Sequence, residues 1–280
     1  MNFAVFILSH KRAERVETYD ALRKSGYSGD IIVVVDDEDE QLSLYQQRFG
    51  KELVVFNKQR YINSSDAIYP KEKRGSALYA RNFIESIARA SAYDGFVMID
   101  DDITSFRYRW VDNDSVKSLC VGQFLDKVFE YYIEYMKDAK IATTSFPFSM
   151  FFVSGVNGLD TKISESRHTY EIHIRNTDFP VEWKSVINQD TITELLTMQR
   201  GYIWWSIPFV VIDGLPMNRL SGGLKGVYDS ITDFDKAFLA VITNPSGCKV
   251  AHSNGTRSSM YIKENKNTTY PMIVSGRYKK

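Results

Sequence analysis

Three consecutive carboxylates, Asp100, Asp101 and Asp102, directly follow a run of four apolar residues. Unpaired carboxylates repel one another and are costly to bury, so this arrangement favours a bound cation. Successive side chains of an extended chain point to opposite sides, and Asp100 and Asp102 therefore offer two hard oxygen ligands on one side. Such ligands suit Mg²⁺ or Mn²⁺ holding a diphosphate. The alternative is an acidic turn at a strand end, with side chains that cap a helix or face water.

Two later residues extend this chemistry. Asp190 stands where a helix is predicted to begin, and there it acts either as a favourable negative charge in the first turn or as a general base for an acceptor hydroxyl. His252 is a candidate further metal ligand if the fold returns it to the carboxylates, although a lone histidine is more often structural or exposed. A diphosphate carried by a divalent ion is the ligand that uses all these groups, and the ion would neutralise the leaving diphosphate.

Basic and glycine residues supply further candidate phosphate contacts. Arg81 lies in the first two turns of a predicted helix, where a guanidinium and backbone amides meet a phosphate; a solvated or salt-bridged arginine fits equally well. Gly222 and Gly223 allow backbone amides to approach a ligand closely, but a tight turn uses such a pair too.

The elements that must position these residues follow from hydrophobic periodicity. Short apolar runs predict buried strands at residues 3–9, 31–35, 53–56 and 95–103. Apolar spacing and terminal glycines predict helices at residues 13–24, 41–49 and 76–92, while residues 61–75 are predicted to form a loop. The alternation of strand and helix predicts right-handed crossovers and a parallel sheet covered by helices.

Polar residues cluster just past the predicted strands, where open parallel sheets bind ligands. Ser9, His10 and Arg12 follow the first strand, and Asp36 and Asp37 follow the second. These clusters place candidate ligand groups at the same sheet edge as the three carboxylates.

The second half of the chain is less regular. A Tyr-rich helix is predicted at residues 123–137, apolar strand pieces at 141–152, and a core strand interrupted by Pro208 at 202–211. Residues 157–168 are either a mobile loop over a site or an ordinary surface loop. Residues 249–280 hold seven Lys or Arg residues besides His252 against a single acid, Glu264, with interleaved tyrosines. This bias suits either a grip on a polyanion or a solvated C-terminus.

The composition is that of an ordinary globular protein, with 280 residues, 44% hydrophobic residues and 35 basic against 35 acidic residues. This length allows one large or two small domains. The balanced charge gives no global field for nucleic acid or membrane, although a local basic patch is compatible with it. No apolar run reaches the roughly 18 residues of a membrane span, and the N-terminus lacks signal-peptide features, so we expect a cytoplasmic protein. Cys120 and Cys248 fit buried thiols better than a disulfide.

Four segments in this order, FILSHKR, VVVDDED, ARN on a helix and FVMIDDDI, resemble the nucleotide-sugar half of GT-A fold glycosyltransferases. More narrowly, the chain resembles the phage TET-associated glycosyltransferases, which move a sugar onto hydroxymethylated pyrimidines in DNA; NQDT and SGGLKGVY have counterparts there. The resemblance spans most of the chain and is strongest over residues 1–103. It implies an α/β, GT-A-like, mostly parallel sheet flanked by helices, with a nucleotide-sugar half at 1–110 and an acceptor half at 111–280.

The resemblance also implies roles for residues. Asp102 would ligate the metal, Asp100 would face the donor ribose, and Asp190 would be the catalytic base of an inverting enzyme. From the residue types alone, Asp100 and His252 are further candidate metal ligands. Here Asp190 follows Gln189 rather than the usual Glu, which leaves the stereochemical course open. The residues predicted to bind the donor, from the resemblance and from the residue types together, are Ser9, His10, Arg12, Asp36, Asp37, Arg81, Asp100, Asp101, Gly222 and Gly223.

The function implied is a metal-dependent transfer from a UDP-sugar to hydroxymethylated pyrimidine, foremost hydroxymethylcytosine, in double-stranded phage DNA within the host cytoplasm. Access to the base is either through the major groove or by flipping it between aromatic side chains. Basic candidates for DNA contact outside residues 249–280 are Lys71, Lys73, Arg74, Lys162 and Arg167.

Other functions fit parts of the pattern. The same fold acting on a saccharide or protein shares every donor residue. A nucleotidyltransferase usually has a glycine-rich first loop, which residues 9–12 lack. A non-enzymatic DNA-binding module with a degenerate nucleotide fold would show no metal-dependent nucleotide affinity.

Overall fold

The computed structural model describes residues 1–68, 74–149, 168–215, 231–253 and 259–264. The strands are β1 (Phe3–Leu8), β2 (Ile31–Asp36), β3 (Leu53–Phe56), β4 (Gly95–Asp100), β5 (Ile103–Asp112), β6 (Ser115–Cys120), β7 (Thr143–Ser145), β8 (Ile172–Asn176), β9 (Trp204–Ser206), β10 (Val210–Gly214), β11 (Cys248–Ser253) and β12 (Ser259–Glu264). The helices are α1 (Glu17–Lys24), α2 (Leu42–Phe49), α3 (Lys58–Ser64), α4 (Leu78–Ala90), α5 (Leu125–Ala139), α7 (Gln189–Met198) and α9 (Asp233–Thr243), with a 3₁₀ turn η1 (Gly50–Glu52).

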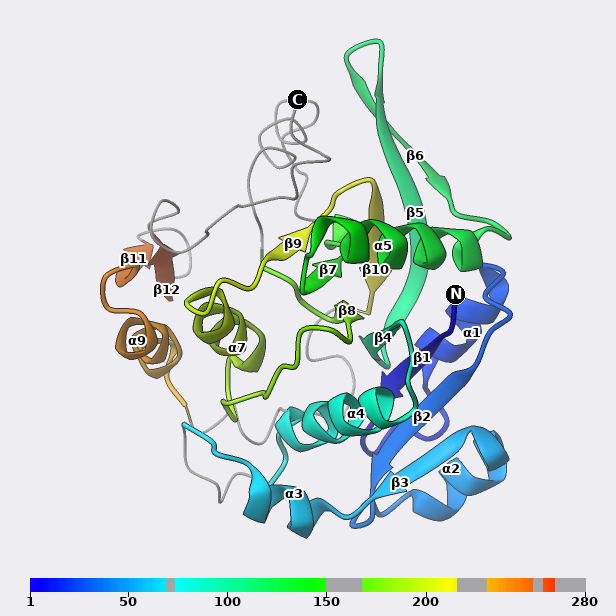
Figure 1. The fold of residues 1–280 in the computed structure, drawn as a ribbon, viewed down its shortest axis with the longest axis horizontal. Coiled ribbons are helices and arrows are strands. Elements are labelled where there is room, and N and C mark those ends of the chain that lie inside the picture. Colours follow the sequence, from blue (N-terminus) through cyan, green and yellow to red (C-terminus); the bar gives the residue numbers. More distant parts are fainter. Residues whose placement is uncertain (69–73, 150–167, 216–230, 254–258, 265–280) are drawn as a thin grey trace.

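A seven-stranded sheet with the order β3-β2-β1-β4-β8-β7-β9 forms the centre of the molecule (Figure 1). The pairs β3-β2, β2-β1, β1-β4 and β7-β9 are parallel, whereas β8 is antiparallel to both of its neighbours. This sheet confirms the predicted α/β class with a mostly parallel sheet flanked by helices. The four N-terminal strands predicted from the sequence make up one side of it.

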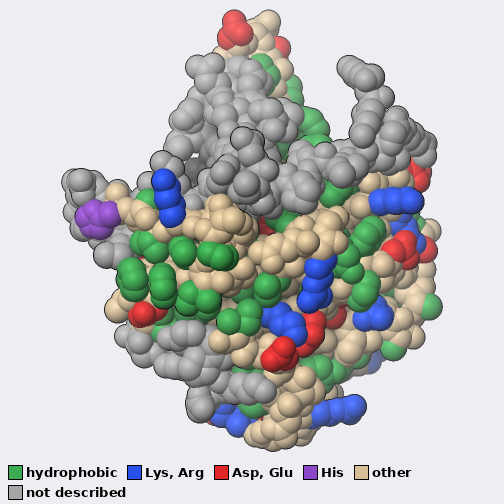
Figure 2. All heavy atoms as spheres, turned by 60° about the vertical axis from the view of Figure 1, so that its left-hand side comes forward, with side chains coloured by type: hydrophobic (Ala, Val, Ile, Leu, Met, Phe, Trp, Pro, Cys, Tyr) green, Lys and Arg blue, Asp and Glu red, His purple; other side chains and the backbone are tan. Residues whose placement is uncertain are grey.

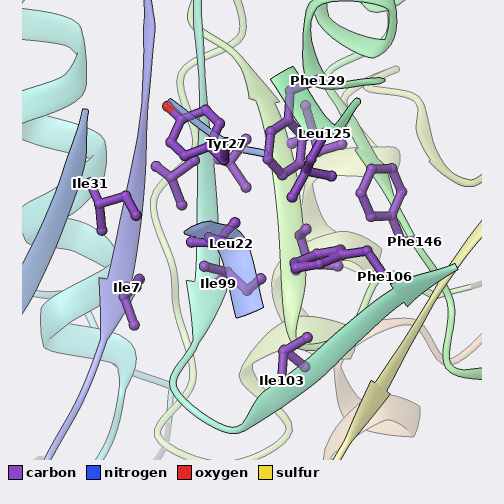
Figure 3. Packing of buried hydrophobic residues seen from close by; sticks show 14 of the residues in the cluster. Ile7, Leu22, Tyr27, Ile31, Ile99, Ile103, Phe106, Leu125, Phe129 and Phe146 are labelled. Atoms are coloured by element: carbon purple, nitrogen blue, oxygen red, sulfur yellow. The ribbon is translucent and has the colours of Figure 1, made fainter. Parts of the chain in front are cut away.

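Two hydrophobic cores lie on opposite faces of this sheet, because alternate residues of each strand point to opposite sides. Val5 and Ile7 of β1 join the core formed with α1, α2 and α5, part of which is drawn in Figure 3. Phe6 and Leu8 join the other core, formed with α4, α7 and α9. Both cores combine residues from the two predicted halves of the chain, and residue 110, the predicted boundary, falls inside β5.

Strands β5 and β6 form a hairpin that projects from the body of the molecule (Figure 1). Asn113 and Asp114 connect them with positive φ angles of 46° and 57°, as a two-residue hairpin turn requires. β10 pairs with the other edge of β5 to make a three-stranded sheet. The first strand of this hairpin, β5, begins directly after the acidic triplet, Asp100–Asp102.

Several predicted boundaries are wrong for local reasons. The strand predicted to reach Ile103 ends at Asp100, and a turn at the next two aspartates separates it from β5. The predicted loop at 61–75 begins with the end of α3, whose N-terminus is capped by the Asn57 side chain accepting from the Arg60 N–H at 2.8 Å. The strand predicted at 202–211 is two strands of different sheets on either side of Pro208.

The helices predicted at 41–49, 76–92 and 123–137 are confirmed as α2, α4 and α5. The helix predicted at 13–24 begins only at Glu17, because residues before it turn: the Arg15 N–H donates to the Arg12 carbonyl at 2.8 Å. None of the described helices is long and apolar enough to cross a membrane. The predicted loop 157–168 lies outside the described residues except for His168.

Candidate functional site

The acidic triplet forms a tight turn that Thr18 holds in place. The Thr18 hydroxyl donates to the Asp100 carbonyl at 2.6 Å and accepts from the Ile103 N–H at 2.9 Å. The Thr18 N–H donates in turn to the Asp101 carbonyl at 3.2 Å. Thr18 is fully buried, so these bonds fix the backbone of the turn from inside the protein.

Replacing Thr18 by valine should therefore destabilise the turn without changing its volume. Two backbone groups, the Asp100 carbonyl and the Ile103 N–H, would lose their partner, and each loss should lower the free energy of unfolding by about 1–3 kcal/mol. We expect urea unfolding to show a lower free energy of unfolding for Thr18→Val. Thr104→Val is the matched control, because the exposed Thr104 hydroxyl donates to the Asp213 carbonyl at the protein surface. Equal losses for the two variants would contradict the assigned role.

Asp101 is the structural member of the triplet. Its carboxylate accepts from the Ser9 hydroxyl at 2.5 Å and from the Arg12 guanidinium at 2.6 Å, and its side chain is buried. Ser9 is also 2.6 Å from the Tyr45 hydroxyl. The loop after β1 is therefore tied to the triplet, which brings the predicted donor residues Ser9 and Arg12 to the predicted place.

The predicted donor residues His10 and Asp36 lie in a second cluster beside this loop. His10 Nδ1 is 3.2 Å from Asp36 and 3.0 Å from Asp39, and Lys58 is 3.2 Å from Asp36. Among the described residues, these three groups, His10, Asp36 and Asp39, are close enough to hold an ion between them. In the absence of an ion, the two neighbouring aspartates raise the pKa of His10 to about 9, which favours its charged form at neutral pH. Asp37 lies next to them, exposed, where it accepts from the Lys58 N–H at 2.9 Å.

The charged His10 should contribute pH-dependent stability. Its folded pKa lies above the ordinary value of 6.5, so the contribution is complete below pH 6.5 and is lost as pH rises to about 9. We expect this loss to amount to roughly 2–3 kcal/mol. Thermal unfolding of the wild type and of His10→Gln at pH 6 and pH 9 measures it: the wild type should exceed the variant at pH 6 and match it at pH 9. A constant difference would refute the ion pair.

Arg81 joins the triplet to the candidate base. Its guanidinium is 3.2 Å from Asp100 and 3.3 Å from Asp190, and its side chain is only 1% exposed. It also lies 4.7 Å from the ring centroid of Trp183, which favours the guanidinium through a cation–π contact. The structure thus brings three predicted site residues together: Arg81 from α4, Asp100 from β4 and Asp190 from the first turn of α7.

His173, which the sequence reasoning missed, holds the other side of Asp190. Its Nε2 is 3.1 Å from Asp190, and its Nδ1 is 3.1 Å from the Thr169 hydroxyl. Burial lowers the pKa of His173 to about 4, so the ring is neutral, and the carboxylate selects the tautomer that donates from Nε2. Burial opposes ionisation of Asp190, but Arg81 and His173 outweigh it and hold the pKa of Asp190 below its ordinary value. Asp190 is therefore a carboxylate, the form that accepts a proton.

Replacing His173 by phenylalanine should disorder this carboxylate. The variant keeps a planar ring but leaves Asp190 with one fewer donor, so we expect kcat for sugar transfer to fall about tenfold with KM for the donor unchanged. His173→Gln, which retains a donor, should recover part of the loss. Steady-state kinetics check this, and an unchanged kcat in the phenylalanine variant would contradict it.

Glu171 is a second group that the sequence reasoning missed. It hydrogen-bonds the Asp100 carboxylate, and burial together with Asp100, Asp102 and Asp190 raises its pKa well above the ordinary value. Its backbone has φ 59°, a left-handed conformation that costs a non-glycine residue about 1–3 kcal/mol. Strain of this kind concentrates at functional sites, and here it turns a fourth carboxyl group toward the triplet.

The carboxyl groups around Asp102 fit a divalent cation. Burial, followed by the neighbouring Asp100 and Asp101, raises the pKa of Asp102 to about 7. Four carboxyl groups, those of Asp100, Asp101, Asp102 and Asp190, face two guanidinium groups, those of Arg12 and Arg81. Hard carboxylate oxygens are the ligands of Mg²⁺ and Mn²⁺, which commonly use one or two of them together with substrate phosphates. A divalent metal is therefore consistent with this site.

Other predicted residues lie elsewhere. His252 is exposed on β11, which packs against β12 and α9 and lies apart from β4 in Figure 1, so the structure does not bring it to the triplet. Gly222 and Gly223 lie outside the described residues, as do Lys71, Lys73, Lys162, Arg167 and most of the basic tail. Arg74 is described and pairs with Glu38.

Comparison with known proteins gives one family. A family model described as TET-Associated Glycosyltransferase matches residues 3–206, which is most of the chain and includes the triplet, Arg81 and Asp190. Comparison with curated proteins finds no match.

Among solved structures, glucosyl-3-phosphoglycerate synthase from Mycobacterium tuberculosis, in complex with Mn²⁺, UDP and phosphoglyceric acid, has 9% identity and a TM-score of 0.45 over 96% of this chain and 89% of that one. Mannosyltransferase PcManGT from Pyrobaculum calidifontis, in complex with GDP-Man and Mn²⁺, has 13% identity and a TM-score of 0.44 over 78% and 58%. S. aureus TarS 1-349 has 13% identity and a TM-score of 0.38 over 75% and 60%. These scores are too low to carry an argument about this chain.

Proposed function

Because the chain belongs to the TET-associated glycosyltransferase family, and is therefore a glycosyltransferase, we propose that it moves a sugar from a UDP-sugar to a hydroxymethylated pyrimidine, most directly hydroxymethylcytosine, in phage DNA. The observation that carries this proposal is the pair of groups joined by Arg81. Both carboxylates lie within 3.3 Å of one guanidinium, and in this proposal Asp100 would face the donor and Asp190 the acceptor.

The donor would bind at the carboxyl ends of β1, β2 and β4. Asp102 and Asp100 would hold Mn²⁺ or Mg²⁺, which neutralises the leaving diphosphate as a Lewis acid. The loop residues Ser9 and Arg12, fixed by Asp101, would line the nucleoside, with Asp36 next to them. Arg81 carries a permanent positive charge beside this position and would stabilise the negative charge that develops on the diphosphate.

The acceptor hydroxyl would be activated by Asp190. In this step the hydroxyl oxygen bonds to the anomeric carbon, the bond from that carbon to the diphosphate breaks, and the hydroxyl proton passes to the Asp190 carboxylate. The low pKa of Asp190 keeps it ready to accept that proton at neutral pH. Its two donors, Arg81 and His173, orient the carboxylate toward the side left open to solvent, where 20% of the side chain is exposed.

Nucleoside analysis after reaction tests the proposal. The protein is incubated with Mn²⁺ and a set of UDP-sugars in the presence of hydroxymethylcytosine DNA, hydroxymethyluracil DNA or plain DNA, and the DNA is then digested for mass spectrometry. A sugar mass on a hydroxymethylated nucleoside alone is the expected result. Hydrolysis of the UDP-sugar without any sugar on DNA would favour a saccharide or protein acceptor instead.

A further inference from the structure

Glu171 lies directly opposite Asp100 in the central sheet. Ile99 of β4 pairs with Ile172 of β8 in an antiparallel register, so the next pair along the two chains is Asp100 and Glu171. The Asp100 N–H donates to the Glu171 carbonyl at 2.9 Å, which continues the ladder by one step. The two carboxyl groups are hydrogen-bonded to each other. Like charges directly opposite each other destabilise a sheet, so this pair needs an explanation beyond folding.

This pair lies on the face of the sheet that carries the candidate base. Asp100 is 3.2 Å from Nη2 of Arg81 on α4, and the same nitrogen is 3.3 Å from Asp190 on α7. His173, two residues after Glu171, lies 3.1 Å from Asp190. Helices α4 and α7 pack on this face of the sheet, and α5 packs on the opposite one. Glu171 therefore borders the acidic triplet and the candidate base together.

The proposed reaction leaves one place for the transferred sugar. Its anomeric carbon is bonded to the diphosphate, which an ion at Asp102 would hold, and the acceptor hydroxyl that attacks this carbon gives its proton to Asp190. The sugar ring must therefore lie between Asp102 and Asp190. The charges of Asp100, Asp102 and Asp190 all act on the Glu171 carboxyl group, which places this group beside the same space.

Glu171 has unused hydrogen-bonding capacity in this space. Its side chain is partly exposed, and within the described part of the chain no Lys, Arg or His side chain forms an ion pair with it. A carboxyl group offers about four lone-pair positions, of which the bond to Asp100 uses only one. The left-handed backbone, with φ 59°, holds the group here at a cost in stability. Hydroxyl groups of a sugar are uncharged donors that would satisfy the remaining positions.

We propose that Glu171 binds a hydroxyl group of the transferred sugar and thereby selects the donor. One oxygen of its carboxyl group stays with Asp100, and the other accepts from the sugar hydroxyl. This bond would fix the ring so that its anomeric carbon faces the acceptor. The role rests on the proposed function and adds to it the residue that recognises the sugar.

A role for Glu171 as a further ligand of the ion makes a different prediction. The ion contacts the diphosphate, which UDP and every UDP-sugar share, so the loss of a metal ligand would weaken all of them alike. The loss of a sugar contact would weaken only the nucleotides that carry a sugar. Comparing UDP with a UDP-sugar therefore separates the two roles.

Calorimetric titration in the presence of Mn²⁺ makes this comparison without an acceptor. The probes are UDP, UDP-glucose, UDP-galactose, UDP-N-acetylglucosamine and UDP-xylose, and the UDP-sugar that the wild type binds most tightly is compared with UDP. Glu171→Ala should bind that UDP-sugar about tenfold more weakly, the usual effect of losing a hydrogen bond to a charged group. Its affinity for UDP should equal that of the wild type. Glu171→Gln keeps one acceptor oxygen at the same distance from the backbone and should recover part of the loss.

Two further variants complete the design. Glu171→Asn has a shorter side chain that tolerates positive φ, so it should fold even if the alanine variant does not, and it should show the same selective loss. Glu134→Ala is the matched control, because Glu134 is exposed on α5, which packs on the opposite face of the sheet. This control should bind UDP and the UDP-sugar as the wild type does.

Three outcomes would overturn the assignment. Wild-type affinity of Glu171→Ala and Glu171→Asn for the UDP-sugar would show that Glu171 does not contact the sugar. An equal loss for UDP and the UDP-sugar would show that Glu171 acts through the ion. In both cases UDP binding by the wild type would leave the proposed function standing. Failure of the wild type to bind UDP at all would remove the proposed function together with the role of Glu171.

Discussion

Replacing Asp102 by asparagine is expected to reduce sugar transfer at least about a thousandfold and to abolish its dependence on Mn²⁺. The change keeps the shape of the side chain but removes the charge that would hold the ion. Lewis-acid stabilisation of a leaving diphosphate amounts to several kcal/mol, and about 4 kcal/mol corresponds to this factor. Initial rates at saturating donor, measured over a series of Mn²⁺ concentrations, give the comparison.

Asp114→Asn is the matched control for this variant. Asp114 lies at the tip of the hairpin with φ 57°, a conformation that asparagine adopts as readily. The whole length of β5 separates it from the triplet. The control should retain wild-type rates and the same Mn²⁺ dependence. If Asp102→Asn behaves like the control, the triplet does not hold the ion.

Replacing Asp190 by asparagine should lower kcat by a factor of 10² to 10⁴, the usual contribution of a general base. Asparagine can still accept from Arg81 and His173, so the local structure and the affinity for UDP should stay the same. The separation of kcat from donor binding is the important result, because a residue that merely binds the sugar would raise KM for the donor.

Calorimetric titration with UDP and Mn²⁺ provides the control measurement for Asp190→Asn. A dissociation constant equal to that of the wild type, together with the fall in kcat, identifies Asp190 as the base of an inverting enzyme. A retained kcat would indicate a retaining enzyme, in which this carboxylate has another role.

The first half of the fold was predictable because its strands are buried on both faces and read as continuous apolar runs. β1, β2 and β4 are of this kind, and the glycines after α1 and α2 mark the ends of their helices. The triplet stood out as a candidate site for a different reason: nothing in the local sequence balances its charge. The balancing groups come from Arg81 and Arg12, which are remote in sequence.

β8 was missed because its sequence alternates. In Ile172–Asn176, Ile172 and Ile174 are separated by His173 and Arg175, a pattern typical of a half-exposed strand, yet all five residues are buried. Its polar side chains are buried because they are paired: His173 with Asp190, and Arg175 with Glu85 at 2.8 Å. Such pairing joins residues from β8, α7 and α4, so no local pattern reveals it.

The surface features were equally hidden from local patterns. Tyr131 and Tyr135 predict a Tyr-rich helix, but only the packing of α5 against Trp205 and Tyr108 makes a pocket of them. Likewise, Phe234, Phe238 and Ile242 are exposed on α9, and Figure 2, which brings the α9 side forward, shows hydrophobic side chains gathered on that face.

The most direct test of the account is the affinity of the full chain for UDP with and without a divalent ion. Calorimetric titration of UDP in the presence of Mn²⁺ and again in EDTA isolates the ion's contribution before any acceptor is involved. If Asp100 and Asp102 hold an ion against the donor diphosphate, UDP should bind at least tenfold more tightly with Mn²⁺, and Asp102→Asn should remove that difference. Equal affinity in both conditions would contradict the account.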